Sequence, residues 1–309
     1  MRHFFQKPFM GALVYGTLLV LFTAYVLLDA FVIPRAGVPA VADTAALASA
    51  VTQSSSAQQS TSASEATVTD TSYDDGSIQI SIETLRLDDT TYYVADIQLA
   101  SADSLKTAFA QATYGRNIKA TTSEIAAENN AIFAINGDFY GFRDTGYVIR
   151  GGQLYRDTAS STAQTEDLVI DSDGNFSIIN ESEVTAQQLL EQGAVQVFSF
   201  GPALVEDGQI VVSTGEEVDQ AMTSNPRTAI GQISALHYLV IVSDGRTSES
   251  AGLTLYQLAT LFAQRGCTVA YNLDGGGSST MVFNGNVVNN PTSGRSITER
   301  AVSDIVYIA

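Results

Sequence analysis

Apolar and polar residues alternate along much of the chain from about residue 76 onward, with the period of two that is typical of half-buried strands. The segments "SIQISIETLRL" and "TYYVADIQLA" have this pattern most clearly, and "DDT" between them predicts a turn. Further hairpins are predicted around Gly151-Gly152 and at Asp173-Gly174, where turn residues separate two apolar runs. Strands therefore dominate this part of the chain.

Helix-like periodicity is confined to a few short segments. The clearest is "TLYQLATLFAQRG", in which apolar residues recur three and four apart before Gly266 ends the pattern. Short helices are also predicted at 104–113, 122–130 and 184–193, the second with a capping box that starts at Thr122 or Ser123. Few, scattered helices favour an α+β fold with a mixed, mostly antiparallel sheet core over repeated βαβ units.

The N-terminus has a different pattern, because residues 9–28 are uniformly apolar and carry no charge. A run of about 20 apolar residues is long enough to span a bilayer as a helix, whereas the apolar core of a signal peptide is usually about 7–15 residues long. Arg2 and Lys7 precede the run, so the N-terminus is expected in the cytoplasm and the rest of the chain outside. We predict a single-pass signal anchor of the cell membrane within residues 1–35, although small residues in "VPAVADTAA" leave cleavage open.

Between the anchor and the strand-rich part, the composition shifts to alanine, serine, threonine, glutamine and valine. A segment of this composition cannot bury a core, so residues 36–73 are predicted to be a disordered linker. The folded domain is then expected to cover residues 74–309.

Composition excludes several classes of function. The formal net charge of −18 argues against binding of nucleic acid, because an acidic surface repels phosphates. Cys267 is the single cysteine and lies in an apolar run, where a buried core thiol is expected. A Ser-His-Asp triad would need His237, because His3 lies outside the domain. His237 stands early in an apolar strand, where a core histidine is expected, so a triad is not predicted. No cluster of histidine and cysteine fits zinc.

Three apolar strands each end in an aspartate with a glycine beside it. These are Asp138 in "AINGD", Asp244 in "VSDG" and Asp274 in "NLDGGG". Carboxylates on loops held by a rigid sheet are often catalytic, although aspartate is also common in turns for its own hydrogen bonds. We interpret the three together as catalytic candidates. We predict no cofactor. As an alternative, the three aspartates could bind a divalent cation such as calcium or magnesium.

The glycines after Asp274 suggest a site for an anion. Successive backbone N–H groups without side chains can form an anion-binding nest, and Ser278 and Ser279 add hydroxyl donors. The run lacks the lysine of a Walker loop and the spacing of a dinucleotide-binding loop. Arg227 follows Pro226 and suits bidentate contact with a phosphate, the alternative being a surface arginine at a strand edge. The expected ligand is a phosphate or a sugar hydroxyl.

Several motifs, in order along the chain, resemble the phosphodiester glycosidase family. They include "INGDFYGFRDTGYVIRGGQLYR", "NPRTAIGQ", "VSDGRTSESAGLTLYQLA", "YNLDGGGSSTMVFNGNVVNNP" and "RAVSDIVYI", and the likeness covers about residues 73–309. The resemblance implies removal of a sugar, with N-acetylglucosamine as the expected one, from a sugar-1-phosphodiester. By this resemblance the pocket would contain Asn136, Asp138, Tyr140, Arg227, Asp244, Arg246, Asn272, Asp274, Gly276, Gly277, Ser278 and Ser279.

The sequence therefore predicts a membrane-anchored extracellular hydrolase. Its substrate would be a sugar-1-phosphodiester in an envelope or exopolysaccharide glycopolymer, and its second partner the lipid bilayer, through residues 9–28. Asp274 or Asp138 would act on the anomeric carbon, while Arg227 and Arg246 would stabilise the departing phosphate. Two alternatives stay open: a non-catalytic binding protein for anionic polysaccharide, and a cation-dependent phosphodiesterase that cleaves the P–O bond.

Overall fold

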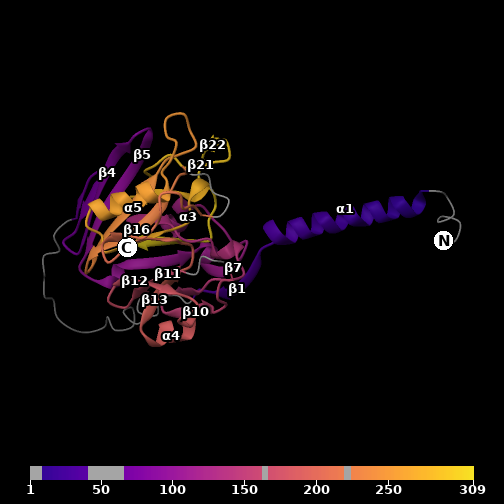
Figure 1. Ribbon diagram of the computed structural model, residues 1–309, viewed down its shortest axis with the longest axis horizontal. Helices are drawn as coiled ribbons and strands as arrows, with labels where there is room; N and C mark the ends of the chain where they lie inside the picture. The colour runs from indigo at the N-terminus through magenta and orange to yellow at the C-terminus, as the bar shows by residue number, and fades with distance from the viewer. Residues whose placement is uncertain (1–8, 41–65, 162–165, 219–223) are drawn as a thin grey trace, which may run out of the picture.

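The computed structural model describes residues 9–40, 66–161, 166–218 and 224–309. Among these residues, the folded part contains one nine-stranded sheet, two five-stranded sheets and three short helices, while helix α1 extends away from it (Figure 1). Every strand pair recorded among the described residues is antiparallel. The predicted α+β class with mostly antiparallel sheets is confirmed.

The largest sheet has the strand order β15-β14-β18-β16-β17-β5-β4-β3-β2. Its centre is buried on both faces, because β17 is an almost unbroken apolar run, whereas β4 begins with the alternating burial of a strand with one face in water. The strands are β2 (Thr67–Val68), β3 (Ser72–Asp74), β4 (Ile78–Leu87), β5 (Thr90–Leu99), β14 (Ala203–Glu206), β15 (Gln209–Ile210), β16 (Thr228–Ser234), β17 (His237–Ser243) and β18 (Val269–Asn272).

Two five-stranded sheets complete the core, in the orders β20-β19-β8-β23-β6 and β10-β9-β13-β11-β12. The first contains β6 (Leu105–Phe109), β8 (Phe133–Asn136), β19 (Met281–Phe283), β20 (Asn286–Val287) and β23 (Asp304–Ile308). The second contains β9 (Val148–Arg150), β10 (Gln153–Arg156), β11 (Glu166–Asp171), β12 (Phe176–Asn180) and β13 (Ala194–Phe198). Two short pairs, β1 (Arg35–Pro39) with β7 (Thr113–Arg116) and β21 (Thr292–Ser293) with β22 (Ser296–Ile297), lie outside these sheets.

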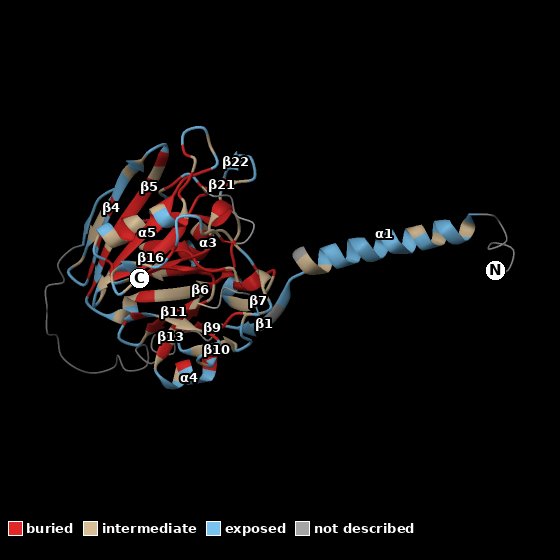
Figure 2. Ribbon diagram, viewed as in Figure 1, coloured by how far each residue is buried: buried red, intermediate tan, exposed pale blue. Residues whose placement is uncertain are grey.

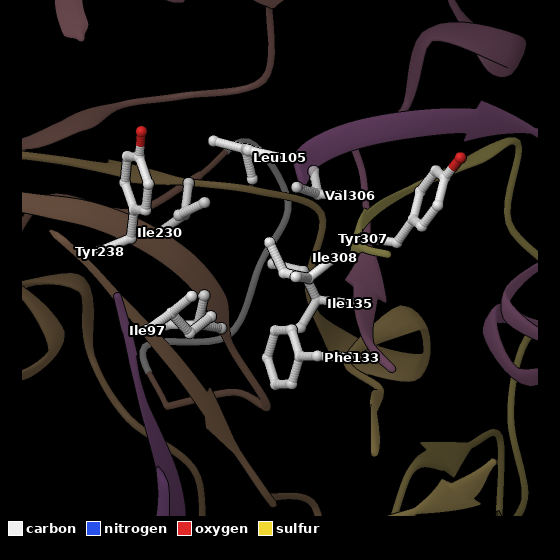
Figure 3. A pocket seen from close by; sticks show the side chains of 10 residues that line it. Ile97, Leu105, Phe133, Ile135, Ile230, Tyr238, Val306, Tyr307 and Ile308 are labelled. Carbon is white, nitrogen blue, oxygen red and sulfur yellow. The ribbon is translucent and has the colours of Figure 1, made fainter. Parts of the chain in front are cut away.

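The nine-stranded sheet packs directly against the sheet that contains β8 and β23. Ile97, Ile230 and Tyr238 from the former face Phe133 and Ile135 from the latter (Figure 3). The cavity left between these side chains measures about 10 Å³, which is room for one water molecule at most. This region is therefore packed core, and any ligand site must lie elsewhere.

Each helix described in the folded part is preceded by a threonine that forms a capping box. The helices are α3 (Thr122–Glu128), α4 (Ala186–Glu191) and α5 (Leu255–Gln264). The box of α3 starts at Thr121 and not at the predicted Thr122 or Ser123, because the Thr121 hydroxyl accepts from the backbone N–H of Glu124. The buried stripe of α5 confirms the helix predicted from its periodicity.

The prediction of a helix at 104–113 is wrong. Residues Leu105–Phe109 form strand β6, and a 3-10 turn, Ala110–Ala112, follows. The backbone of β6 pairs with β23 along its whole length, and Leu105 and Phe109 are buried. Pairing with a strand nearly 200 residues away outweighs a weak local helix propensity. The local pattern could not reveal this long-range pairing.

The predicted linker at 36–73 is bounded too widely. β1 pairs with β7 at one end of this segment, and β2 and β3 form an edge of the nine-stranded sheet at the other. Short edge strands satisfy backbone hydrogen bonds without burying apolar side chains, so composition alone does not reveal them. Residues 41–65 lie outside the described residues.

Helix α1 (Met10–Phe31) contains the predicted apolar run. Its residues Met10–Ala30 have a mean hydropathy of 2.1, and the helix is exposed along most of its length (Figure 2). It is long and apolar enough to span a membrane or to serve as a signal anchor. Where α1 ends, the Asn117 side chain donates to the carbonyls of Ala30 (3.1 Å) and Ile33 (3.2 Å), so the folded part caps this helix.

Candidate active site

The ends of β8 and β18 meet. The side-chain amide of Asn136 donates to the backbone carbonyl of Asp274 (2.6 Å), and its oxygen accepts from the Thr228 hydroxyl (2.8 Å) and the Thr280 N–H (3.2 Å). Asn136 is fully buried. It therefore joins three segments of the site and has little capacity left for a ligand.

Asp274 is the carboxylate at the centre of the arrangement. One oxygen accepts from the Gly275 N–H (2.9 Å), and the other accepts from the Ser278 hydroxyl (2.6 Å) and from Arg300 (3.0 Å). Burial raises the pKa of Asp274, while Arg300 and Ser278 oppose the rise. Arg300 also donates to the Ser278 hydroxyl (2.9 Å), which closes a three-residue network. The carboxylate is thus held in one orientation.

The glycine run is needed for close approach to other parts of the protein. Gly276 has a φ of +61°, and a Cβ there would lie 2.7 Å from a terminal nitrogen of Arg246. A Cβ on Gly275 would lie 2.9 Å from the carbonyl oxygen of Pro226. The 3-10 turn Gly276–Ser278 therefore packs against the Arg246 guanidinium, and side chains at these positions would displace it.

Three arginines supply positive charge around this turn. Arg246 donates through two nitrogens to the side-chain oxygen of Asn225 (3.0 and 3.1 Å), and Arg227 is buried against Glu217 (2.5 Å). Burial lowers the pKa of Arg246, and the charge of Arg300 lowers it further. Burial also lowers the pKa of Arg227, and the charge of Arg246 lowers it more weakly. The arginines therefore repel one another, and an anion bound among them would relieve the repulsion.

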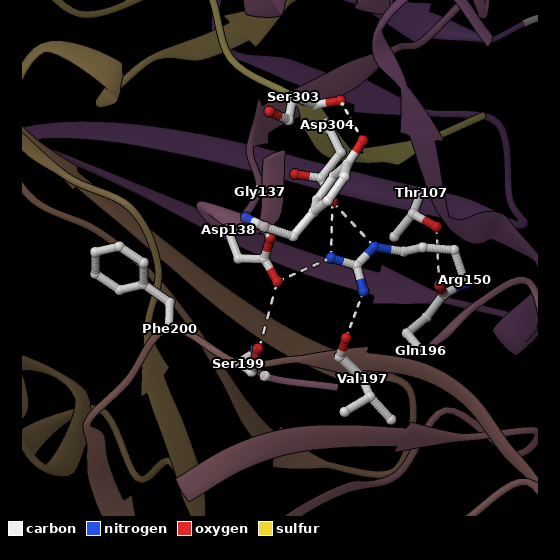
Figure 4. Close-up of polar contacts among 12 residues, drawn as sticks. Thr107, Gly137, Asp138, Arg150, Gln196, Val197, Ser199, Phe200, Ser303 and Asp304 are labelled. Atoms are coloured by element: carbon white, nitrogen blue, oxygen red, sulfur yellow. Dashed lines mark hydrogen bonds and ion pairs between the residues drawn. The ribbon is translucent and has the colours of Figure 1, made fainter. Parts of the chain in front are cut away.

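The side chain of Asp138 binds Arg150 of β9 and the backbone N–H of Ser199, which follows β13. It pairs with Arg150 (3.0 Å), which also binds Asp304 (2.7 Å), and both carboxylates are fully buried (Figure 4). The ring of Phe198 lies 4.1 Å from the guanidinium. Burial raises the pKa of Asp304 to about 7, with Arg150 opposing the rise. Asp138 also accepts from the Tyr140 N–H (2.9 Å), so its visible contacts hold the loop after β8 in place.

Asp244 has a third environment. It accepts from the backbone and side chain of Asn290 (2.8 and 3.0 Å) and from the Tyr93 hydroxyl (3.2 Å). It thereby fixes the segment that leads into β21. Within the part of the chain that the structure describes, no three His, Cys, Asp or Glu side chains are grouped so that they could hold a metal ion. The structure therefore gives no support to a cation shared by the three aspartates.

The remaining predicted residues divide between the site and the core. The Tyr140 ring packs on Tyr114 (5.1 Å) and its hydroxyl donates to the Ser303 carbonyl (3.3 Å), so this side chain is part of the core. Asn272 donates to the Gly201 carbonyl (2.8 Å). The Asn272 oxygen and the Ser279 hydroxyl are buried without a hydrogen-bond partner among the described residues.

Gly277 lies directly beside β21, since a Cβ there would be 3.3 Å from the Cα of Ser293. Among the twelve predicted residues, those that gather at the arginine cluster are Arg227, Arg246, Asp274, Gly276, Gly277 and Ser278.

Sequence reasoning missed Arg150, Arg300 and Asp304. All three stand in motifs quoted for the resemblance, "VIRGG" and "RAVSDIVYI". Arg150 and Asp304 are charged residues within apolar strands, and such residues are rarely buried without a partner of opposite charge. That rule could have indicated the pair, although only the fold shows which residues meet.

The fold and the site together define an α+β protein with a buried carboxylate and an arginine cluster at the ends of antiparallel strands. Residues 129–309 match the sequence profile of the family described as phosphodiester glycosidase. Because this match covers more than half of the chain, the protein belongs to the phosphodiester glycosidase family.

Individual relatives agree with this assignment. The chain is 34% identical over 201 residues to a prophage-derived uncharacterized protein of Bacillus subtilis, covering 63% of this chain and 30% of that protein. It is 28% identical over 191 residues to the N-acetylglucosamine-1-phosphodiester alpha-N-acetylglucosaminidase of Bos taurus, covering 56% and 35%. The chain thus spans about a third of the length of these curated relatives.

A solved structure shares the fold. It is the zebrafish N-acetylglucosamine-1-phosphodiester alpha-N-acetylglucosaminidase catalytic domain, auto-inhibited by its pro-peptide. The TM-score is 0.59 at 22% sequence identity, with 75% of this chain and 82% of that chain covered.

Proposed function

We propose that the protein hydrolyses a glycosyl phosphodiester, releasing the sugar and leaving a phosphomonoester. The observation that carries this proposal is the buried Asp274 carboxylate in contact with Arg300 and beside Arg246. A carboxylate can act on the electrophilic anomeric carbon, while cations beside it accommodate a phosphate leaving group. Membership of the phosphodiester glycosidase family supports the same reaction.

In the proposed mechanism, Asp274 either activates a water molecule or attacks the anomeric carbon itself, and in the second case water then hydrolyses the glycosyl ester to free the sugar and Asp274. The bond between the anomeric carbon and the phosphate oxygen breaks, and its electron pair leaves with the phosphate. A phosphate monoester is a stable leaving group, so the demand for a general acid is smaller than with a sugar alcohol. Arg246 and Arg300 stabilise the charge that develops on it, and Arg227, which is paired with Glu217, interacts electrostatically with Arg246.

Ser278 and Arg300 serve to orient the carboxylate, because both bind the same oxygen of Asp274. Asp138 is engaged by Arg150 and holds the loop after β8, so we assign it a supporting role rather than a direct one. Asp244 supports the segment before β21 in the same way. Asp274 is therefore the carboxylate on which the proposed reaction depends.

For the substrate, we propose a sugar-1-phosphodiester of an envelope or exopolysaccharide polymer, with N-acetylglucosamine as the sugar. The names of the mammalian relatives support this sugar. Helix α1 supports a location at the membrane, and Arg2 and Lys7 before it in the sequence support a folded part outside the cell.

The test uses the purified full chain and the methyl phosphodiester of N-acetylglucosamine-1-phosphate. We expect free N-acetylglucosamine and methyl phosphate. Replacing Asp274 by asparagine keeps its size and removes its charge, and should lower kcat about 10²- to 10⁴-fold. Asp173→Asn, at an exposed turn, is the matched control and should keep the full rate. Binding of the compound without any sugar release, with or without added calcium or magnesium, would contradict the proposal.

A further inference from the structure

Beside the loop that follows β8, two cations and three phenylalanines form a cation–aromatic cluster: Lys119, Phe139, Phe142, Arg143 and Phe200. The rings of Phe139 and Phe142 stack at 4.7 Å and 22°. Lys119 lies over the Phe142 ring at 5.9 Å, and Arg143 lies over Phe139 at 5.8 Å and over Phe200 at 5.0 Å. The rings hold both cations in place without neutralising them.

This cluster adjoins the strand ends that carry the candidate active site. Phe139 directly follows Asp138, and Phe200 precedes Gly201, whose carbonyl accepts from Asn272. Arg143 donates to the carbonyl of Ser199 (3.1 Å), which fixes it between the two segments. Gly137, two residues before Phe139, accepts from the Asp274 N–H (3.3 Å), which places the cluster near the proposed reaction centre. None of the hydrogen bonds or ion pairs of the cluster among the described residues reaches Asp274, so the cluster is separate from that centre.

The charge of the cluster is unusual for this chain, which has 33 acidic and 15 basic residues. Neither Lys119 nor Arg143 forms a salt bridge with a described carboxylate. The acidic neighbour in sequence, Asp144, is paired with Arg116 (2.7 Å). Lys119 is exposed and Arg143 is partly exposed, so an anion from solution can reach both.

We propose that the cation–aromatic cluster is an accessory subsite that binds a second phosphate of a polymeric substrate, one repeat away from the bond that is cleaved. The inference rests on the proposed function for the identity of the polymer, a chain of sugars joined by phosphodiesters. Such a polymer carries one negative charge per repeat. A second phosphate therefore reaches the cation–aromatic cluster when the first is at Asp274. Two cations that form no ion pair with a described residue, held at a fixed position, favour this phosphate over the uncharged end of a short substrate.

Anionic lipid headgroups could be attracted by the same charges, since the cluster lies close in sequence to Asn117, which contacts the end of α1. The aromatic rings argue for the polymer. Phe139 and Phe142 stack on each other and are partly buried, whereas side chains that insert into a membrane interface project into it.

The experiment compares two substrates: the methyl phosphodiester of N-acetylglucosamine-1-phosphate, and an oligomer of several N-acetylglucosamine-1-phosphate units. Lys119→Gln and Arg143→Gln each remove one charge. Lys106→Gln on β6 and Arg265→Gln after α5 are the matched controls. We expect each cluster variant to lower kcat/KM and calorimetric affinity for the oligomer about fivefold, as for one exposed ion pair, with the methyl compound unchanged.

Several results would overturn the subsite. An unchanged kcat/KM and affinity for the oligomer would do so, as would an equal loss on both substrates or the same loss in the two control variants. A loss of binding to phosphatidylserine vesicles with no effect on the oligomer would assign the cluster to the membrane. If the unmodified protein cleaves neither substrate, the proposed function fails. The calorimetric affinity of Lys119→Gln and Arg143→Gln for the oligomer still decides the subsite in that case.

Discussion

At Asp274, burial and a neighbouring cation act in opposite directions on one carboxyl group. Burial favours the neutral acid and raises its pKa, whereas Arg300 favours the charged form. The proposed reaction needs the charged form, because a protonated carboxyl can neither attack the anomeric carbon nor accept a proton from water. Arg300 is therefore expected to set the lower pH limit of activity.

The Arg300→Gln variant tests this expectation. Removing the cation raises the pKa of Asp274 further, so Asp274 becomes protonated at a higher pH as acid is added. The acid limb of the profile of kcat/KM against pH should move to higher pH, and the plateau should fall because only Ser278 and the Gly275 N–H then orient the carboxylate. Arg265→Gln removes the same charge away from the site and should leave the limb in place. An acid limb that stays or moves to lower pH would contradict this role.

The residues of the site were only partly predictable from the sequence. Asp274, Arg246 and the glycine turn could be found, because a strand end followed by glycines is a local signal. The direction in which Asp138 points could not be found locally, since it depends on Arg150 and Asp304 from other strands. Arg300 binds a residue 26 positions away, and no spacing rule connects the two.

At the scale of elements, Asp138, Arg150 and Asp304 join the sheet of β8 and β23 to the sheet of β9 and β13. Asp304 begins β23 and Arg150 ends β9, so their contact is also a contact between layers. Two buried carboxylates share one guanidinium there, and Asp304 keeps its proton to about pH 7 because burial disfavours its charge.

This arrangement makes stability depend on pH in a definite direction. The unfolded chain loses the Asp304 proton near pH 4, so between about pH 4 and pH 7 the native state binds more protons than the unfolded state. The contribution of Asp304 to stability is therefore full below pH 4 and is lost as the pH rises through 7. Asp304→Asn should show a smaller fall in the free energy of urea unfolding between pH 5 and pH 8 than the unmodified protein. An identical fall in both, with Asp173→Asn as control, would show that Asp304 does not titrate in this range.

Elements with a strong hydrophobic periodicity were predicted well, whereas strand β6, which lacks one, was not. The hairpin β4–β5 and helix α5 follow directly from their alternation and their buried stripe. Strand β6 was mistaken for a helix because its five residues are held by β23 and not by their own pattern. Which strands are neighbours in the sheets, such as β16 beside β18, was likewise set by long-range packing.

At the scale of the whole molecule, α1 and the folded part favour different environments. The helix exposes apolar side chains over most of its length, which water does not favour, whereas the remaining chain is strongly acidic. We expect the full chain to sediment with membranes and to stay there in alkaline carbonate. A chain that starts at Arg35 should be released. Recovery of the full chain in the soluble fraction, with mass spectrometry confirming residue 1, would contradict a membrane anchor.

The central claim is that water attacks the anomeric carbon and that the phosphate leaves with its original oxygens. The most direct measurement runs the reaction on the methyl phosphodiester of N-acetylglucosamine-1-phosphate in oxygen-18 water and analyses the methyl phosphate by mass spectrometry. The phosphate is the product to examine, because the anomeric oxygen of a free sugar exchanges with water. Cleavage of the C–O bond predicts methyl phosphate without label; one oxygen-18 atom in the phosphate would show P–O cleavage and contradict the account.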